Sequence, residues 1–79
     1  MKVEYLTIFD KQEENWEWFK RNYSRLVGRF DGEHVAVFER KVVDHDKDLK
    51  RLVSRVRGKF PFERVLVKFV SKEKVVLVL

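Results

Sequence analysis

The sequence of 79 residues predicts an α+β fold, a two-layer sandwich in which two amphipathic helices cover a mixed sheet. Residues 10–30 and 46–57 carry apolar side chains at the 3.6-residue spacing of a helix. Runs rich in valine and of strand length occupy residues 34–39, 41–44, 64–70 and 75–79. Gly32 and Gly58 follow the two helical stretches, where a helix commonly ends. We therefore expect a single domain with the element order (β)αββαββ.

The first nine residues are expected to form an extended arm or a short edge strand. Their larger side chains alternate imperfectly with polar neighbours, at Val3, Tyr5, Thr7 and Phe9. Asp10 then offers an N-cap, and Glu13 lies three residues later as in a capping box. A helix is therefore expected to begin at Asp10.

The first helical stretch has one apolar face, which predicts that it packs on the sheet. That face consists of Trp16, Phe19, Tyr23, Leu26, Val27 and Phe30. Acidic residues dominate its first turns and basic residues its later turns, an order that favours the helix dipole. These charges thus have a structural explanation.

A hairpin and a second helix follow. The strands on either side of Glu39-Arg40-Lys41 are expected to pair through a tight reversal, although no glycine or asparagine defines its turn type. Asp46 or Asp48 can cap the second helix, which is expected to end near Arg57. Its apolar stripe is Leu49, Leu52, Val53 and Val56. The connection to the strand at 64–70 should be a right-handed crossover if the strands that it joins lie parallel.

Composition excludes several classes of protein. The sequence has no cysteine, so disulfides, thiolate metal sites and thiol catalysis are excluded. No stretch approaches the roughly 20 apolar residues that span a bilayer, and the first residues do not resemble a signal peptide. Charged residues are abundant and amides are few, a profile common in heat-adapted proteins. We expect a cytoplasmic protein.

Catalysis is not expected from this sequence. Asp44-His45-Asp46 has residue types that bind metals, but three consecutive side chains do not easily converge on one ion. The simpler interpretation is a turn in which His45 faces solvent. No glycine-rich phosphate loop is present. We expect no enzyme activity, no cofactor and no metal site.

The second helix carries the sharpest functional signal. Residues 47–60 contain six basic residues and one acidic residue, Asp48. The basic residues are candidates for binding an anionic partner: Lys47, Lys50, Arg51, Arg55, Arg57 and Lys59. The alternative is that acidic residues from elsewhere in the fold neutralise this face.

Two further features are candidates for an interface. Trp18 lies on the polar side of the first helix, where it can be covered by residues 3–9, stack on Arg25 or anchor a partner. The terminal strand is apolar on both faces, which favours core packing first and a dimer interface second. Its candidate contact residues are Val76, Leu77 and Val78.

The chain also resembles a known family. The resemblance is carried by Trp18-Phe19-x3-Tyr23, by Gly32-Glu33-x-Val35-Ala36-Val37 and by Phe69-Val70-Ser71-Lys72-Glu73. These motifs are similar to those of a small prokaryotic family, frequent in heat-loving archaea and of unknown function. The resemblance implies an αββαβ core and an intracellular setting, and it brings no catalytic residues. Family members tend to be acidic on the second helix, and this sequence departs from that tendency.

Taken together, these features predict a non-catalytic binding module that works through protein–protein contact, as a dimer or as a subunit of an assembly. The runner-up is a basic protein associated with RNA or ribonucleoprotein, which contacts phosphates through the second helix with Arg64 and Lys68. Neither a membrane nor a small-molecule substrate is expected as a partner.

Overall fold

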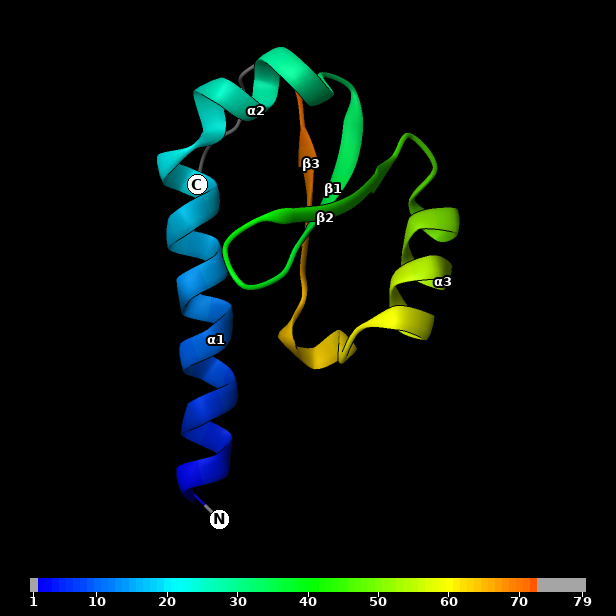
Figure 1. Ribbon diagram of the computed structural model, residues 1–79. Coiled ribbons are helices and arrows are strands. Elements are labelled where there is room, and N and C mark those ends of the chain that lie inside the picture. The colour runs from blue at the N-terminus through cyan, green and yellow to red at the C-terminus, as the bar shows by residue number, and fades with distance from the viewer. Residues whose placement is uncertain (1, 73–79) are drawn as a thin grey trace.

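The computed structural model describes residues 2–72, with side chains from residue 12 onward. It has an α+β fold with three helices and a three-stranded sheet (Figure 1). The helices are α1 (Lys2–Arg21), α2 (Tyr23–Phe30) and α3 (Leu49–Lys59), and a short 3-10 helix, η1, covers Phe62–Arg64. The strands are β1 (Glu33–Val37), β2 (Val42–Asp46) and β3 (Leu66–Val70). The strand expected at 75–79 lies outside the described residues.

The sheet is antiparallel, so the expected mixed sheet is wrong for the described strands. Its order is β2-β1-β3, and β1 pairs antiparallel with both neighbours. Consequently β2 and β3 run in the same direction on either side of β1, and α3 connects them. The connection through α3 therefore does join parallel strands, but these strands are not adjacent.

The helices lie on both faces of the sheet, which corrects the expected two-layer arrangement. Val35 and Val37 of β1 pack with Phe19 on the side of α1 and α2. Ala36, between them, packs with Leu52 and other side chains on the side of α3. Val35, Ala36 and Val37 are fully buried because β1 is a central strand covered on both faces (Figure 1).

The N-terminal segment is helical, so the expected strand or arm at residues 1–9 is wrong for residues 2–9. Helix α1 begins at Lys2, and Asp10 lies inside it rather than at its cap. Once a helix has formed, each added residue contributes a hydrogen bond without a new nucleation cost. For residues 3–9, extension of the helix is therefore favoured over the strand that their imperfect alternation suggested. Figure 1 shows these first turns of α1 projecting beyond the rest of the fold.

The expected single helix over residues 10–30 is divided at Asn22. The Asn22 side-chain amide donates to the carbonyl of Trp18 at 2.8 Å, alongside the backbone N–H of Asn22 at 3.0 Å. Side-chain bonds of this kind compete with regular helix geometry. The chain turns here, and α2 packs against β1 and β3 at the end of α1 (Figure 1).

The predicted reversal after β1 is a two-residue turn. Glu39 and Arg40 both have positive φ, at 51° and 61°, and the N–H of Phe38 donates to the carbonyl of Lys41 at 2.9 Å. Two consecutive positive φ values define a type I′ turn, which suits the twist of a hairpin. Such φ values are unfavourable for residues other than glycine, so tertiary contacts must hold this turn.

Asn15 supplies such a contact from α1. Its side chain is 2% exposed, and its Oδ1 accepts from the backbone N–H of Arg40 at 3.2 Å. Its Nδ2 donates to the carbonyl of Arg64 at 2.8 Å. One buried amide therefore joins α1, the hairpin turn and the end of η1. Gln12, one turn earlier, adds bonds to the carbonyls of Glu63 and Val65 at 3.0 and 3.1 Å.

The hairpin contains a β-bulge in β2. Val37 pairs with Val42, whereas Ala36 pairs with Asp44, so Val43 is an extra residue on β2. Val42 packs on the side of α1 and α2, and Val43 packs on the side of α3, as regular alternation requires. After the bulge, Asp44 shares the α3 side of the sheet with Ala36.

Helix α3 follows its prediction in part. Asp48 is the N-cap and accepts from the N–H of Arg51 at 3.1 Å. Leu52 and Val56 are fully buried as expected, but Leu49 is 45% exposed. The helix continues through Gly58 to Lys59 instead of ending near Arg57. Within residues 2–72, no helix has the length and apolarity needed to cross a membrane.

The Asn15 contacts generate a stability prediction. Asn15→Ala removes both hydrogen bonds of a buried amide and leaves two part-buried backbone groups without their partner, so we expect the free energy of unfolding to fall by about 2–3 kcal/mol. Urea denaturation followed by circular dichroism measures this loss. Asn22→Ala, which removes a bond within one helical turn, is the control and should cost about 1 kcal/mol or less. Equal losses for the two variants would contradict the role given to Asn15.

The hairpin turn generates a second prediction. Replacing Glu39→Asn together with Arg40→Gly provides residues that tolerate positive φ, so we expect a gain of about 1 kcal/mol in unfolding free energy. The matched control, Glu39→Ala with Arg40→Ala, keeps the unfavourable φ values and should give no gain. A gain in the control, or none in the Asn-Gly variant, would show that the turn is not strained.

Candidate functional site

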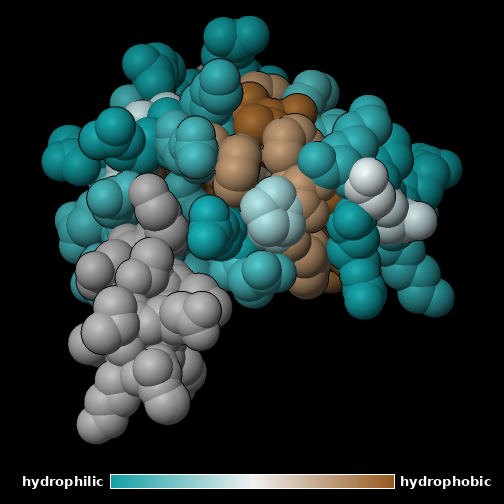
Figure 2. Space-filling view, turned by 60° about the horizontal axis from the view of Figure 1, so that its bottom comes forward, coloured by the Kyte–Doolittle hydropathy of each residue, from teal (hydrophilic) through white to brown (hydrophobic). Residues whose placement is uncertain are grey.

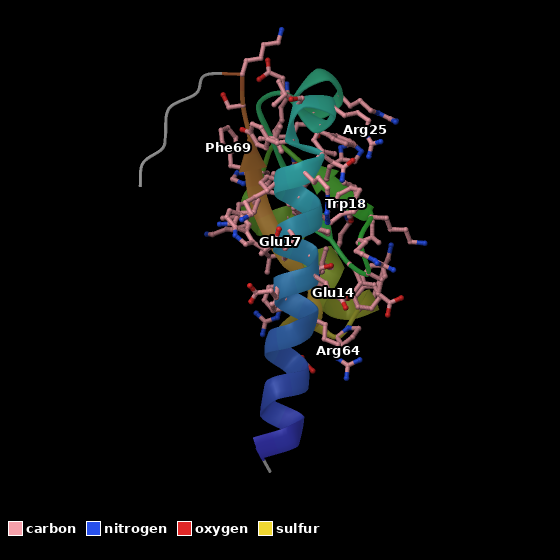
Figure 3. The ribbon with its side chains drawn as sticks, turned by 90° about the vertical axis from the view of Figure 1, so that its left-hand side faces the viewer. Glu14, Glu17, Trp18, Arg25, Arg64 and Phe69 are labelled. Atoms are coloured by element: carbon pink, nitrogen blue, oxygen red, sulfur yellow. The ribbon has the colours of Figure 1, made fainter. Side chains whose placement is uncertain are left out.

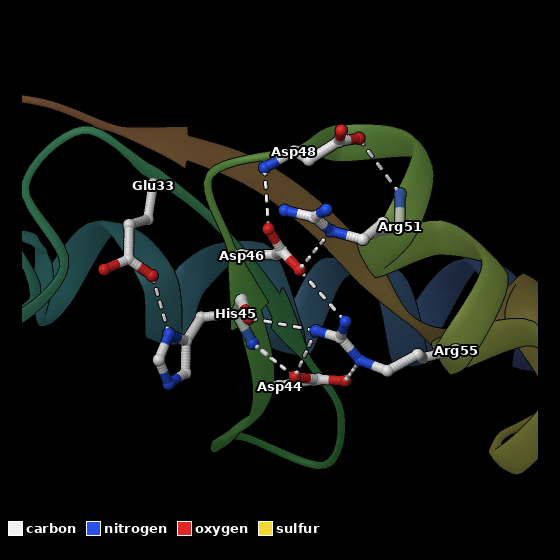
Figure 4. A network of polar contacts seen from close by, with 7 residues as sticks. All are labelled: Glu33, Asp44, His45, Asp46, Asp48, Arg51 and Arg55. Carbon is white, nitrogen blue, oxygen red and sulfur yellow. Dashed lines mark hydrogen bonds and ion pairs between the residues drawn. The ribbon is translucent and has the colours of Figure 1, made fainter.

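Arg55 of α3 is held by the two aspartates of β2. Its Nε donates to Asp44 Oδ2 at 2.9 Å, and its Nη2 donates to Asp44 Oδ1 at 3.0 Å. Its Nη1 donates to Asp46 Oδ2 at 3.0 Å, and Nη2 also reaches the carbonyl of His45 at 3.1 Å (Figure 4). We call this group, Asp44, Asp46 and Arg55, the β2–α3 clamp. It fixes α3 against the edge of the sheet.

The clamp shifts the pKa of each of its members. Hydrogen bonds from Arg55 lower the pKa of the Asp44 carboxyl below its ordinary value, against the opposing effect of burial. The backbone N–H of Asp48, followed by Arg55, lowers the pKa of Asp46 to about 2. The two carboxylates in turn raise the pKa of Arg55. All three groups are therefore charged at neutral pH, and the Arg55 guanidinium offsets one of the two carboxylate charges.

The clamp divides the six basic candidates of the second helix. Arg55 is fully engaged, and the Nε of Arg51 lies 3.5 Å from Asp46 Oδ2. The alternative raised from the sequence, neutralisation by acids from elsewhere in the fold, therefore applies to these two residues. The other four have no ion pair among the side chains described, residues 12–72: Lys47, Lys50, Arg57 and Lys59.

Two of these four flank an exposed apolar strip on α3. A shallow hollow of about 670 Å³ is lined by Leu49, Lys50, Val53, Ser54 and Arg57, and we call these residues the α3 outer face. The guanidinium of Arg57 lies 5.5 Å from the ring centre of Phe62, which is itself 37% exposed. The apolar stripe of α3 thus serves two surfaces. Leu52 and Val56 cover the sheet, whereas Leu49 and Val53 face outward.

The sequence predicts that His45 faces solvent, but in the structure its ring also contacts two other side chains. Its Nδ1 lies 2.6 Å from Glu33 Oε1, and its ring centre lies 4.7 Å from that of Phe30. Its ring therefore faces the side of α2, whereas Asp44 and Asp46 face α3 (Figure 4). Within the part of the chain that the structure describes, no group of three or more histidine, aspartate or glutamate side chains is placed to hold a metal ion.

The clamp also occupies the open edge of β2. The N–H of His45 donates to Asp44 Oδ1 at 2.8 Å, and its carbonyl accepts from Arg55. These backbone groups therefore point away from β1 and are satisfied by side chains. Edge strands are commonly protected in this way against pairing with another chain.

Trp18 lies beside a groove between α2 and β2. The groove has a volume of about 590 Å³, and it is lined by apolar side chains together with Arg25, Arg29, Asp44 and His45. We call it the α2–β2 groove. Trp18 is half-buried and packs against the core on the side of α1 and α2. Figure 3 shows Trp18 and Arg25 on one side of α1 and Phe69 on the other.

The alternatives for Trp18 can now be separated. Cover by residues 3–9 is wrong, because these residues continue the same helix toward its N-terminus and do not fold back on Trp18. Trp18 and Arg25 line one groove. The other proposed interface residues, Val76, Leu77 and Val78, lie outside the described residues.

Sequence reasoning missed Arg25 and Arg29 as site residues. The excess of basic residues late in the first helix has a sufficient explanation in the helix dipole. A signal was nevertheless present, because two arginines four residues apart repel each other and no acid lies between them. Their position beside His45 depends on how α2 packs against the hairpin, which local sequence does not specify.

The geometry defines a small α+β protein with an antiparallel sheet between helices and two basic surfaces, the α3 outer face and the α2–β2 groove. A family model described as "Family of unknown function (DUF5678)" matches residues 25–73. That span is more than half of the chain, so the chain belongs to this family. It includes the sheet, α3 and most of α2. Among curated proteins and among solved structures, neither comparison finds a match.

The clamp predicts a specific pH dependence. The pKa of Asp46 is lowered from 3.8 to about 2 in the folded state, so its contribution to stability is present above about pH 4 and is lost as pH falls toward 2. Asp46→Asn should therefore be less stable than the wild type at neutral pH, and the difference should close below about pH 4. Thermal unfolding at several pH values measures this.

Glu14→Gln is the control for this experiment. Glu14 is exposed and has no ion pair among the side chains of residues 12–72. Its stability relative to the wild type should change little over the same pH range. A difference between Asp46→Asn and the wild type that stays constant down to about pH 2 would show that the Asp46 carboxylate is not stabilised by the Asp48 N–H and Arg55.

Proposed function

We propose that the protein is a non-catalytic binding module that acts through protein–protein contact, with the α3 outer face as its contact surface. The observation that carries this proposal is that Leu49 is exposed and lines a hollow together with Val53, Lys50 and Arg57. An apolar centre with a polar rim is the usual anatomy of a protein interface, and arginine is enriched there. The rim contains no acidic residue, so the partner surface should be acidic.

The neighbouring surface supports a contact larger than the hollow itself. Phe62 is exposed and lies under Arg57, which extends the apolar surface from α3 to η1. Figure 2, which brings the η1 end of the molecule forward, shows an apolar band between two hydrophilic regions. Apolar patches bordered by polar residues often mark interaction sites.

Contact with RNA is the second candidate. The four basic side chains without ion pairs in the described region support it, since phosphates favour such groups: Lys47, Lys50, Arg57 and Lys59. Two observations favour protein contact instead. Arg55 is fully occupied by the clamp, and the middle of the face is aliphatic rather than basic or aromatic.

The setting and the assembly state form part of the same proposal. We propose the cytoplasm of a heat-adapted archaeal cell, which the absence of cysteine and the scarcity of amides support. Action as a dimer or as a subunit of a larger assembly is compatible with a chain this small.

Charge reversal on the α3 outer face tests the proposal. Lys50→Glu with Arg57→Glu should abolish retention of protein partners in affinity isolation from the native cell, and nuclease treatment should not alter the proteins that the wild type retains. Lys41→Glu with Lys72→Glu changes the charge equally at exposed positions away from α3 and is the control. It should retain the same partners as the wild type.

The same experiment distinguishes RNA. Loss of all retained protein after nuclease would favour the RNA alternative. In that case, binding of the purified protein to polyuridylate should weaken with salt, with a logarithmic slope of about −0.7 per phosphate contacted. Equal retention by the α3 variant and the control would contradict both candidates for this face.

A further inference from the structure

We propose that the α2–β2 groove is a second binding site, which takes an extended acidic segment of a partner protein. An apolar side chain of that segment would rest on the floor of the groove, and its carboxylates would pair with Arg25 and Arg29. This site is separate from the α3 outer face, and its proposal does not depend on the proposed function of that face.

The floor of the groove is apolar and is already formed. Trp18 and Phe30 supply one side, and Val42 supplies the other. Leu26 is buried in the core and Trp18 packs against the same core, so the floor is rigid. A groove of about 590 Å³ accommodates a few side chains of a bound segment.

The rim of the groove has positive charge that no described residue neutralises. Arg25 and Arg29 are exposed, and neither forms an ion pair with the side chains of residues 12–72. The acidic groups nearby have other partners, since Asp44 is bound by Arg55 and Glu33 is bound by His45. Two like charges four residues apart on a helix repel each other, and an anionic ligand relieves this repulsion.

The spacing of the two arginines suits an extended peptide. Four helical residues advance about 6 Å along the helix axis. Alternate residues of an extended chain lie about 6.6–6.8 Å apart and point to the same side. An acidic residue at every second position therefore meets both arginines, while the intervening side chains point toward the floor.

The aromatic rings of the groove favour a peptide over a nucleic acid. Single-stranded nucleic acids bind on aromatic rings with a free face. The Phe30 ring already contacts the guanidinium of Arg29 at 5.7 Å and the ring of His45 at 4.7 Å. Trp18 is half-buried against the core. Val42 adds an aliphatic side chain to the floor, which suits a leucine-like side chain better than a base.

The clamp determines how such a segment is recognised. Because the N–H and carbonyl of His45 are bonded to Asp44 and Arg55, a partner strand cannot extend the sheet along β2 at this position. Recognition therefore depends on side chains in the groove rather than on backbone pairing at the edge.

Titration of the ¹⁵N-labelled protein with a capped Glu-Leu-Glu-Leu-Glu peptide, followed by NMR, tests the proposal. The protein has two tryptophans, and only Trp18 lines the groove. We expect a saturable shift of the Trp18 indole signal and little change at Trp16. Arg25→Glu with Arg29→Glu should weaken binding at least about tenfold, and this variant should instead bind the matching Lys-Leu-Lys-Leu-Lys peptide.

The controls separate this site from the α3 outer face. Lys50→Glu with Arg57→Glu should leave the peptide affinity within about twofold of the wild type, since those residues lie on a different surface. Arg25→Gln with Arg29→Gln, which avoids new charge on α2, serves as the second variant if charge reversal lowers the thermal midpoint. It should also lose the acidic peptide.

Several outcomes would overturn the proposal. These are no Trp18 shift at millimolar peptide, equal binding of the acidic and basic peptides by the wild type, or full binding by the glutamine variant. A Trp18 shift with a decauridylate oligonucleotide but not with the acidic peptide would show that the groove binds a nucleic acid instead of a peptide. None of these results bears on partner retention by the α3 outer face, so the two proposals fail separately.

Discussion

The fold depends on one buried amide, that of Asn15. It bonds the hairpin turn through the N–H of Arg40 and the end of η1 through the carbonyl of Arg64, and it does so from α1. A buried amide without these partners would destabilise the core, so α1 has one position along the sheet at which the bonds are satisfied. Since α2 follows α1 directly, the position of the α2–β2 groove depends on the same contact.

The β2–α3 clamp has a second organising role, because it determines which charges are available to a partner. A helix with six basic residues looks uniformly cationic in the sequence, but the clamp uses Arg55 completely and Arg51 partly. What remains is an apolar strip between Lys50 and Arg57. The clamp also closes the open edge of β2 at His45. Two aspartates thus shape both of the surfaces proposed for binding.

Local patterns predicted the elements that depend on local interactions. An aspartate N-cap for α3, left open between Asp46 and Asp48, the buried pair Leu52 and Val56, and the reversal at Glu39 and Arg40 all follow from spacing and residue type. The layer arrangement did not follow, because an apolar run such as Val35 to Val37 fits a sheet covered on one face or on two. The partners of Arg55 lie on another element and are brought to it only by tertiary packing.

The bulge in β2 has a consequence for how the chain selects its pairing. Without Val43 as an extra residue, regular pairing would place Asp44 opposite Val35 and turn both aspartates toward the layer of Leu26. Arg55 would then face an imidazole and would lose both of its carboxylate partners. A one-residue slip therefore breaks the β2–α3 clamp. The aspartates of β2 thus help to fix the register of the hairpin, because only the observed register lets both of them pair with Arg55.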